Sequence, residues 1–292
     1  DKKGIKEIFK TLCILGKNCF DIVVDLQNNK KSHLLSFLSF APKRFGYDNG
    51  KSSFLLNNKS KDTLKSIGPI EHQFRVLSML GIKLEDPRLE LWPGIAQDEW
   101  VKKFLKDNWL DESWNLIGIN PGSSSKWFTK RWPATLFAKF CDEIAKSYHT
   151  RVVIIGSKED LILAKDIASK TLSKPIVAAG KTDLRELISL IKRLKVLVTS
   201  DSAPLHIGSA LNVPCVALFG PTDPARHIAA VNLKTAVTVI RKNLKCSPCY
   251  KPTCIRNYKC MKNISVEEVV KAVSGYISDD KSLSLEAASH DA

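Results

Sequence analysis

Short apolar runs alternate with amphipathic stretches along the second half of the chain. The runs lie at residues 115–120, 151–156, 175–178 and 196–199. Between them, residues 135–147, 158–170 and 183–192 space their apolar side chains as one face of a helix. Buried strands that alternate with amphipathic helices are typical of a parallel sheet covered on both faces. The pattern therefore predicts an α/β fold.

The first half of the chain is less regular. Residues 21–26 form a short run with β-branched side chains, which predicts a buried strand. Residues 31–40 space Leu and Phe as in an amphipathic helix that ends before Pro42. Residues 68–81 predict another helix, and residues 83–98 hold two prolines and a glycine between helical patterns. We place a linker there.

The chain is accordingly divided into two domains and a tail. Residues 1–100 form a partial first domain with the linker, and residues 101–278 form the second domain. A capping box that begins at Ser265 predicts a terminal helix, which we expect to brace the first domain. The tail, residues 279–292, is polar, so we expect it to be disordered.

Charge and length limit the classes of function. The 292 residues carry 45 Lys and Arg against 30 Asp and Glu, a net charge of +15, which favours anionic partners. No RNA-binding or zinc-finger consensus accompanies this charge, so we expect no nucleic acid partner. The longest stretch without charged residues, residues 202–222, is interrupted by three prolines, and no secretory signal is visible. We therefore expect a soluble, cytoplasmic protein.

The loops that follow the predicted strands carry polar and charged residues. Ligands of parallel sheets bind at the carboxyl ends of the strands, where these loops share one edge. Ser123 and Ser124 offer hydroxyl groups, and Lys130 with Arg131 offers positive charge, a combination that suits a diphosphate. Glu159, after the next strand, is placed to accept hydrogen bonds from a ribose. The alternative is that these are ordinary loop, surface and helix-cap residues.

One segment, residues 201–220, predicts a sharp turn, a helix of small residues and a second buried strand. Asp201, Ser202 and Ala203 fall where that helix begins. A helix start has backbone N–H groups without partners and the positive end of the helix dipole, so it suits a phosphate. The segment suggests a nucleotide or sugar-phosphate site, although Ser or Asp at such a position also serves as a purely structural cap.

Four of the eight cysteines lie close together in the sequence, as Cys246, Cys249, Cys254 and Cys260. This density suggests a structural site for a metal held by four thiolates. The spacing matches no standard zinc finger or ferredoxin, and a cytoplasmic location disfavours lasting disulfides. A reduced or redox-labile cluster is therefore the alternative.

Four motifs taken together resemble a known family. They are NPGSSSKWFTKRWP, GSKED, DSAPLHIGSALNVPCVALFGPTDP and CSPCYKPTCIRNYKCM. In order and spacing they resemble the ADP-heptose:lipopolysaccharide heptosyltransferases of glycosyltransferase family 9. The segment FDIVVDLQNNKKSHLLSFLSFAPKRFGY resembles the acceptor-side strand and helix of that family, so the resemblance runs from about residue 20 to residue 277.

The resemblance implies a fold and a reaction. The fold is GT-B, two Rossmann-like domains with parallel sheets facing a cleft, and the C-terminal domain holds the donor nucleotide. The reaction transfers a heptose, with inversion, from ADP-heptose or a related nucleotide sugar to the lipopolysaccharide core or its lipid A precursor. The acceptor is then an anionic glycolipid, and the protein is peripheral on the cytoplasmic face of the inner membrane. The chemical step is expected to need no cofactor.

The resemblance also assigns site residues. Ser123 and Ser124 match hydroxyl positions near the donor diphosphate, and Lys130 matches the basic residue that stabilises the leaving group. Glu159 matches the ribose-binding carboxylate, although Asp160 aligns almost as well. The remaining matches fall on the family's Asp-Ser/Thr-Gly-x-x-His loop and on the loop that lines the donor pocket: Asp201, Ser202, His206, Gly220, Pro221, Thr222 and Asp223.

The chain departs from the family pattern at two places. Ala203 stands where the family commonly has Gly, which is harmless at a helix start and costly at positive φ, and we expect a helix start. The family's N-terminal strand and Gly-Asp loop, whose Asp is the general base, has no match in residues 1–20, so we expect the base to be absent and the N-terminal domain incomplete. His206 has a second interpretation as a core histidine that anchors its helix. Alternative functions are a nucleotide-sugar-binding remnant without turnover and a GT-B sugar epimerase.

Overall fold

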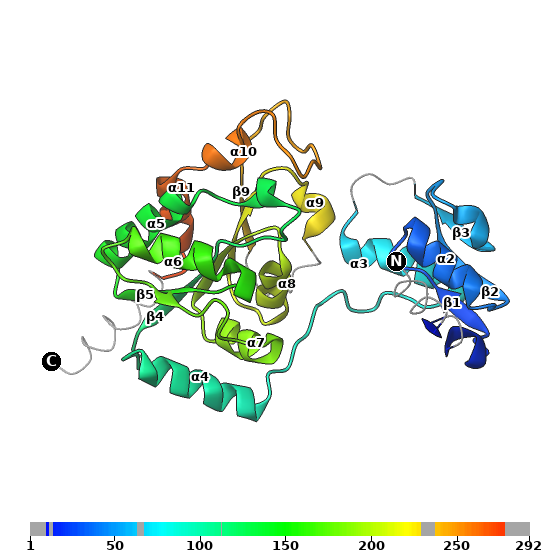
Figure 1. Cartoon of the computed structure of the whole chain (residues 1–292), viewed down its shortest axis with the longest axis horizontal. Helices are drawn as coiled ribbons and strands as arrows, with labels where there is room; N and C mark the ends of the chain where they lie inside the picture. The colour runs from blue at the N-terminus through cyan, green and yellow to red at the C-terminus, as the bar shows by residue number, and fades with distance from the viewer. Residues whose placement is uncertain (1–9, 12–13, 63–66, 112, 229–236, 278–292) are drawn as a thin grey trace. The chain divides into compact units, whose positions relative to one another are not determined.

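The chain divides into two compact units, Asp1–Pro87 and Arg88–Ala292, which Figure 1 shows in blue to cyan and in green to red. This computed structural model describes residues 10–11, 14–62, 67–111, 113–228 and 237–277. Every pair of neighbouring strands in these residues is parallel. The α/β class that the alternation predicts is therefore confirmed. The predicted tail, residues 279–292, lies outside the described residues.

The larger unit, residues 88–292, contains a six-stranded sheet with the order β6-β5-β4-β7-β8-β9. Its strands are β4 (Asn115–Asn120), β5 (Thr150–Ile154), β6 (Ile176–Val177), β7 (Val196–Ser200), β8 (Cys215–Phe219) and β9 (Val237–Arg241). From β4 the chain moves outward to β6, and from β7 it moves outward in the opposite direction. The connections after β4 and β7 therefore run in opposite directions along the sheet, which makes the gap between these strands a topological switch point. Open α/β sheets bind ligands at such a point.

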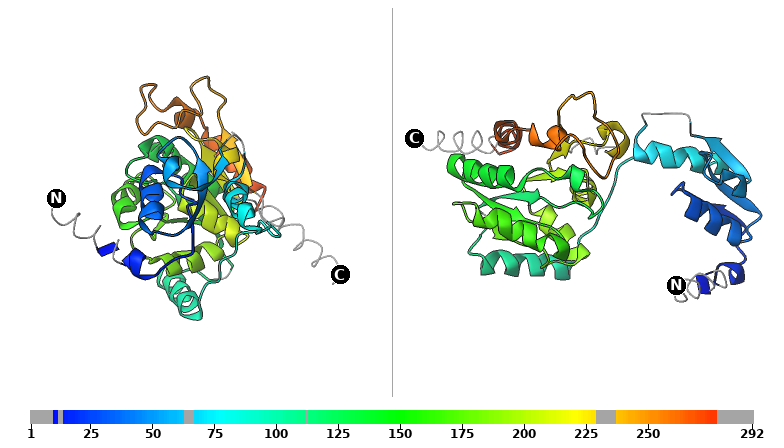
Figure 2. Two further views of the ribbon diagram at one scale, coloured as in Figure 1. Left: turned by 90° about the vertical axis from the view of Figure 1, so that its right-hand side faces the viewer. Right: turned by 45° about the horizontal axis from the view of Figure 1, so that its top comes forward.

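Helices cover both faces of this sheet (Figure 2). They are α4 (Ile95–Asp107), α5 (Ala134–Ser147), α6 (Leu161–Ser169), α7 (Leu184–Lys192), α8 (Ala203–Ala210), α9 (Pro224–His227), α10 (Lys259–Lys262) and α11 (Val266–Ser274). One core contains Phe137 and Phe140 of α5 with Val269 of α11, and the other contains Phe104 of α4 and Leu190 of α7. The strands read as continuous apolar runs because both faces are buried.

The smaller unit, residues 1–87, has a three-stranded sheet with the order β1-β2-β3. Its elements are β1 (Ile22–Val24), α2 (Lys30–Leu38), β2 (Lys43–Asp48), the 3-10 turn η1 (Ser53–Leu55), β3 (Asn58–Lys61), α3 (Pro69–Leu77) and the turn η2 (Ser78–Leu80). Phe45, Tyr47 and Val76 form its buried core. The Tyr47 ring stacks on His72 with centroids 4.1 Å apart.

Helix α2 forms where the spacing of Leu and Phe predicts a helix, but those residues do not form its buried face. Leu34 is 48% exposed and Phe37 is 43% exposed, whereas His33 and Ser36 are the buried residues. Polar contacts account for this choice, because His33 lies against Asp25 and the Ser36 hydroxyl donates to the Ser32 carbonyl. The spacing thus identifies the helix and misidentifies its inner face.

The terminal helix begins as its capping box predicts. The Ser265 hydroxyl accepts from the Glu268 backbone N–H, and a Glu268 carboxylate oxygen accepts from the Ser265 backbone N–H. Val266, Val269 and Val273 of α11 then join the core of residues 88–292. Within the described part of the chain, no helix is long and apolar enough to cross a membrane.

Candidate functional site

A pocket of about 630 Å³ opens at the carboxyl ends of β4, β5 and β7. Among the residues predicted for a donor site, those that line it are Ser123, Ser124, Arg131, Glu159, Ser202 and Ala203. The predicted residues that lie outside its lining are Lys130, Asp201, His206, Gly220, Pro221, Thr222 and Asp223. The predicted residues therefore fall into two neighbouring groups, joined where Asp201 precedes Ser202.

The first group includes the start of α8. Ser202 is the N-cap of this helix, yet its side chain forms no capping hydrogen bond. Its hydroxyl instead contacts Asn120 Nδ2 at 3.0 Å and Thr199 Oγ1 at 3.0 Å. Pro204 has no N–H group, and the Leu205 N–H donates to the Ser202 carbonyl at 3.0 Å. The Ala203 N–H is thus the first-turn donor that Ser202 leaves uncapped, at the positive end of a helix dipole that faces a pocket. This arrangement suits an anionic group.

Ala203 is the first residue of α8 and is not among the residues with positive φ. The expectation of a helix start at this position is confirmed. Since the backbone here is helical, a methyl group adds no conformational strain.

Arg131 brings a cation to the same pocket and is held in place by Ser123. Its Nε donates to Ser123 Oγ at 3.2 Å, and its Nη2 donates to the Ser123 carbonyl at 2.9 Å. Arg131 Nη2 also lies 3.6 Å from Asp160 Oδ1, and its guanidinium stacks over the Phe128 ring at 4.3 Å. A Cβ at Gly122 would lie 2.4 Å from the Asp160 carboxylate, so the close approach of this loop requires glycine.

Glu159 and Asp160 differ in their surroundings. Asp160 is buried, and its Oδ2 accepts from the backbone N–H of Ser157 at 3.0 Å and from the Ser157 hydroxyl at 2.8 Å. Glu159 is exposed and lines the pocket, and the nearby Ser157 side chain lowers the pKa of its carboxyl. Of the two carboxylates, Glu159 is the one placed to accept hydrogen bonds from a bound hydroxyl.

The second group surrounds the carboxylate of Asp201, whose side chain is 6% exposed. Two donors converge on its Oδ2, Lys130 Nζ at 2.7 Å and Thr222 Oγ1 at 2.8 Å, and His227 Nδ1 lies 3.3 Å from the same oxygen. The Lys130 ammonium also lies 5.0 Å from the centre of the Trp127 ring. Asp201 thus fixes the end of a long cationic side chain next to the start of α8.

Two histidines lie near this carboxylate. Burial lowers the pKa of His206 below its ordinary value, Asp201 opposes that shift and Lys130 adds to it. Burial also lowers the pKa of His227. The Asp201 carboxylate opposes this shift, and Lys130, Arg226 and His206 lower the pKa further. Both imidazoles therefore favour the neutral form more than a histidine in water does.

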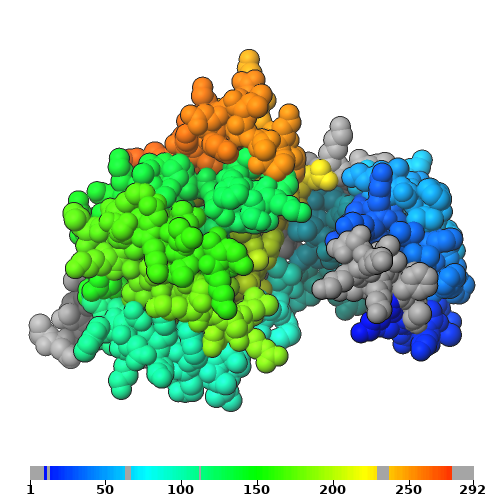
Figure 3. Space-filling view, viewed as in Figure 1, coloured from blue at the N-terminus to red at the C-terminus, as the bar shows by residue number. Residues whose placement is uncertain are grey.

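The predicted loop from Gly220 to Asp223 is bonded to the segment that contains the four cysteines. The backbone N–H groups of Cys249 and Tyr250 both donate to the Pro221 carbonyl, and the Ser247 hydroxyl donates to the Gly220 carbonyl. Thr129, beside Lys130, donates its hydroxyl to the Lys251 carbonyl at 3.0 Å. Figure 3 shows the region around residue 250, in orange, projecting from the body of this unit. The segment braces the loops that hold Lys130 and Thr222.

The predicted metal site at Cys246, Cys249, Cys254 and Cys260 is not supported. Among the residues that the structure describes, no group of three His, Cys, Asp or Glu side chains is arranged to hold a metal ion. All four cysteines are free. Burial raises the pKa of the Cys260 thiol, and a metal needs the thiolate. The Cys254 Sγ accepts from the Tyr258 N–H at 3.3 Å, so this thiol serves the local fold.

Several pocket residues were missed in the sequence. They are Asn120, Gly122, Ser125, Gly156, Ser157, Thr182, Asp183, Leu184, Leu187 and Pro204, whereas Asp160, the alternative to Glu159, also lines the pocket. Thr182 and Asp183 follow the short strand β6, so the rule that placed the other loops at this edge would also have found them. His227 follows the predicted loop of residues 220–223, but its contact with Asp201 could not be predicted, because it joins positions far apart in the sequence.

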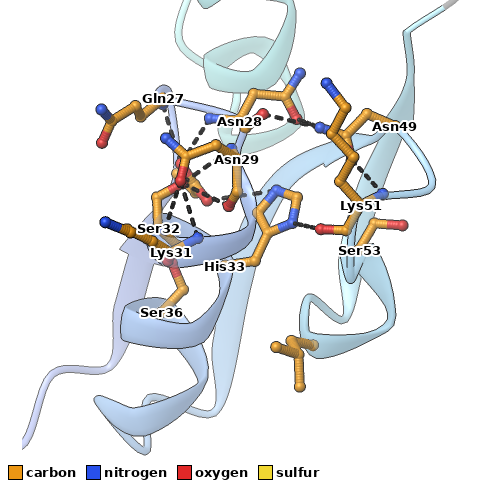
Figure 4. A network of polar contacts seen from close by, with 12 residues as sticks. Gln27, Asn28, Asn29, Lys31, Ser32, His33, Ser36, Asn49, Lys51 and Ser53 are labelled. Atoms are coloured by element: carbon orange, nitrogen blue, oxygen red, sulfur yellow. Dashed lines mark hydrogen bonds and ion pairs between the residues drawn. The ribbon is translucent and has the colours of Figure 1, made fainter.

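The smaller unit also has polar residues at the carboxyl ends of its strands, but they bond to one another (Figure 4). Asn49 Nδ2 donates to the carbonyl of Asn28 at 2.9 Å and to its side-chain oxygen at 2.6 Å. Asp25 Oδ1 accepts from the backbone N–H groups of Gln27 and Asn28. His33 donates from Nδ1 to the Lys51 carbonyl, and its Nε2 lies 3.5 Å from Asp25 Oδ2. Asp25 is therefore a buried structural carboxylate.

Comparison with known proteins connects this geometry to a family. The family model described as "Glycosyltransferase family 9 (heptosyltransferase)" matches residues 8–259. The chain is 29% identical over 225 residues to lipooligosaccharide heptosyltransferase 2 of Haemophilus influenzae, an alignment that covers 72% of this chain and 64% of that protein. The chain thus spans slightly less than two thirds of the length of this curated relative.

Solved structures agree on the fold. A glycosyl transferase family 9 protein from Veillonella parvula superposes with a TM-score of 0.76 at 25% identity, covering 93% of this chain and 79% of that one. The E. coli ADP-heptose lps heptosyltransferase II superposes with a TM-score of 0.69 at 22% identity, covering 94% and 82%. These neighbours confirm the GT-B class of α/β fold.

Proposed function

The chain belongs to glycosyltransferase family 9, the heptosyltransferase family, and on this basis we propose that it binds a nucleotide-activated heptose and serves heptose transfer to lipopolysaccharide. The proposed donor is ADP-heptose, and the transfer proceeds with inversion at the sugar carbon. The proposed acceptor is the lipopolysaccharide core or its lipid A precursor. The H. influenzae relative, named a lipooligosaccharide heptosyltransferase, supports this choice of acceptor.

One observation carries the proposal, namely the uncapped start of α8 at the pocket of residues 88–292. Its Ala203 N–H has no side-chain cap, and Arg131 lines the same pocket. Lys130 is held next to this helix start by Asp201 at 2.7 Å. Two cations and a helix N-terminus converge on one edge of the sheet, which is the arrangement that a diphosphate requires. Glu159 at the pocket rim supplies an acceptor for a ribose hydroxyl.

The same groups account for a lower barrier to sugar transfer. Breaking the bond between the sugar carbon and the diphosphate develops positive charge on the sugar and negative charge on the leaving group. Donors fixed before the reaction stabilise that negative charge without reorganising, and one such donor contributes about 3–4 kcal/mol. An ammonium has three N–H donors, and Asp201 accepts from Lys130 Nζ with its carboxylate at 2.7 Å and with its backbone carbonyl at 3.4 Å, so one donor remains for a phosphate oxygen.

Charge supports an anionic acceptor and a position at a membrane surface. The net charge of +15 attracts phosphorylated glycolipids as well as the acidic cytoplasmic face of the inner membrane. We place the protein there as a peripheral protein. The chemistry as proposed uses no cofactor, and the segment that contains the four cysteines braces the loops around Lys130 and Thr222.

A thermal shift experiment tests the donor site. ADP-heptose at about a hundred times its dissociation constant should stabilise the chain by about 2.7 kcal/mol, a shift of roughly 5–10 °C. UDP-glucose at the same concentration is the matched control and should give a small shift. A larger shift with UDP-glucose than with ADP-heptose rejects the proposed donor, and no shift with either rejects the site.

A transfer assay tests the activity separately. Heptose-deficient lipopolysaccharide is incubated with ADP-heptose and the chain, and released ADP together with the mass of the acceptor is measured. The proposal predicts an acceptor heavier by one heptose. Binding of ADP-heptose without any change in the acceptor supports the donor site and contradicts the activity of this chain.

A further inference from the structure

Three groups contact one oxygen, Oδ2, of the Asp201 carboxylate. Lys130 at 2.7 Å already supplies one full positive charge, and the Thr222 hydroxyl supplies a further hydrogen bond at 2.8 Å. His227 Nδ1 is the third group on the same oxygen, at 3.3 Å. Its imidazole therefore faces a carboxylate whose charge is balanced by another residue. A proton on His227 gains little as long as Lys130 stays in this position.

The groups that face His227 come from five segments of the chain. Lys130 belongs to the 3-10 turn Phe128–Lys130, Asp201 follows β7, His206 is on α8, and Arg226 is its neighbour on α9. The Tyr250 ring, from the cysteine-containing segment, lies 5.8 Å from the imidazole. The net effect of burial, one carboxylate and three basic groups is to lower the pKa of His227. The imidazole is thus mainly neutral near pH 7 in the ligand-free chain.

A bound diphosphate changes this balance, as the proposed function requires. Lys130 turns N–H donors toward phosphate oxygens, so that less of its charge remains for Asp201. The buried carboxylate then faces two anionic phosphates, and a like-charge contact in a partly buried site is costly unless positive charge is added. The Thr222 hydroxyl adds no charge. His227 is the titratable group in direct contact with Asp201 that gains a charge by binding a proton.

We propose that binding of the nucleotide diphosphate donor is coupled to uptake of one proton by His227, which makes His227 a positioning residue for Asp201 and Lys130. The proton comes from solvent when the donor binds and returns to solvent when the nucleotide leaves, so no net proton is consumed in a cycle. This inference rests on the proposed donor site and extends it to the protonation state in which the site holds a diphosphate.

Calorimetry in two buffers detects such a proton directly. ADP-heptose is titrated into the chain near pH 7 in MOPS and in Tris, whose ionisation enthalpies differ. Each phosphorus of ADP-heptose carries one ester and one anhydride oxygen, so the ligand itself has no phosphate that titrates between about pH 5 and pH 8. The slope of the observed enthalpy on the buffer ionisation enthalpy should correspond to uptake of a fraction of one proton. Affinity should rise several-fold between about pH 8 and pH 6.

Two variants assign the proton to one residue. His227→Asn keeps an N–H donor for Asp201 without a titratable ring, so it should reduce the slope to near zero and flatten the pH dependence. His206→Asn removes the other imidazole near Asp201 and should keep the slope. Melting temperatures of both variants establish that they are folded.

Three results decide the matter. Measurable binding with no buffer dependence in the unmodified chain overturns the inference and leaves the donor site intact. A slope that persists in His227→Asn and disappears in His206→Asn also overturns it, because the proton then belongs to the other histidine. Failure of ADP-heptose to bind in either buffer rejects the proposed function, and the coupling with it.

Discussion

The two units of this chain place polar residues at the same edge of similar parallel sheets, with different outcomes. In residues 1–87 the helix that follows the first strand, α2, has an N-cap, Asn29, whose side chain accepts from the N–H groups of Lys31 and Ser32. In residues 88–292 the N-cap of α8, Ser202, forms no such bond and its helix start faces a pocket. A capped helix start needs no ligand, whereas an uncapped one at a pocket has donors to offer.

The buried carboxylates of the two units also differ. Asp25 Oδ1 in the first unit accepts from two backbone N–H groups, whereas its Oδ2 is buried without a hydrogen-bond partner among the described residues, 3.5 Å from His33 Nε2. Asp201 Oδ2 in the second unit is in contact with Lys130 Nζ, Thr222 Oγ1 and His227 Nδ1. The carboxylate of the second unit therefore holds a cation in place, which Asp25 does not.

The units also differ in the size of their cores, and a matched substitution measures this difference. Phe140 is fully buried in the large core of α5 and α11, so Phe140→Ala should destabilise residues 88–292 by about 3–5 kcal/mol. All six tryptophans lie in this unit, so tryptophan fluorescence during urea unfolding reports on it alone. Phe45 belongs to the three-residue core of residues 1–87, and Phe45→Ala should leave the fluorescence transition unchanged. A shift of that transition by Phe45→Ala would contradict the independence of the two cores.

Removing one lysine charge at the carboxyl edge of each sheet tests which of the two units binds the donor. Lys130→Gln should weaken ADP-heptose binding by about ten- to a hundred-fold, because a hydrogen bond from a charged group to phosphate contributes about 1.5–3 kcal/mol. The matched change Lys31→Gln, at the exposed start of α2, should alter the affinity by less than about twofold. Titration calorimetry measures both. Equal losses of affinity would remove the distinction between the two edges.

The caps offer a smaller and more specific test. Asn29→Ala should destabilise residues 1–87 by about 1 kcal/mol through the loss of two capping hydrogen bonds. Because α2 has no role in donor binding here, the affinity for ADP-heptose should not change. Hydrogen exchange of α2 measures the first effect and calorimetry the second. A marked loss of donor affinity in Asn29→Ala would show that the first unit takes part in the donor site.

The smallest expected effect is on the pH dependence of stability. The pKa values of His206 and His227 are lowered in the folded chain, chiefly by burial, so each binds a proton more readily when unfolded. Stability from these residues is present above the unfolded pKa and is lost as pH falls from about 7 toward the lowered folded values. The fluorescence melting temperature should fall over this range, and less steeply in His206→Asn. A melting temperature that rises as pH falls from 7 would contradict the direction of both shifts.

Much of the larger unit follows from sequence alone. The apolar runs of β4, β5, β7 and β8 are buried on both faces and therefore carry a strong signal, and the small-residue helix α8 begins where Asp201, Ser202 and Ala203 predict it. The loops at the pocket could be predicted because the carboxyl ends of parallel strands share one edge. The strand β9 was not predicted, although Val237, Thr238, Val239 and Ile240 are β-branched residues typical of a strand.

The sequence did not show which residues far apart along the chain are in contact, or which polar groups form hydrogen bonds within the protein. Lys130 and Asp201 are both visible as candidate residues, but their pairing depends on how two loops converge. The two helix starts with Asn29 and Ser202 look equivalent in sequence, since both residues are good N-caps. The four closely spaced cysteines suggested a metal, and only their placement shows that the segment binds loop carbonyls instead.

Hydrogen exchange with and without ADP-heptose compares the two edges in one experiment. Donor binding should slow exchange in peptides that contain residues 120–131 and 200–206 and leave peptides that contain residues 25–32 and 48–53 unchanged. Protection at the edge of residues 1–87 with none at the edge of residues 88–292 would contradict the assignment of the donor to the uncapped start of α8.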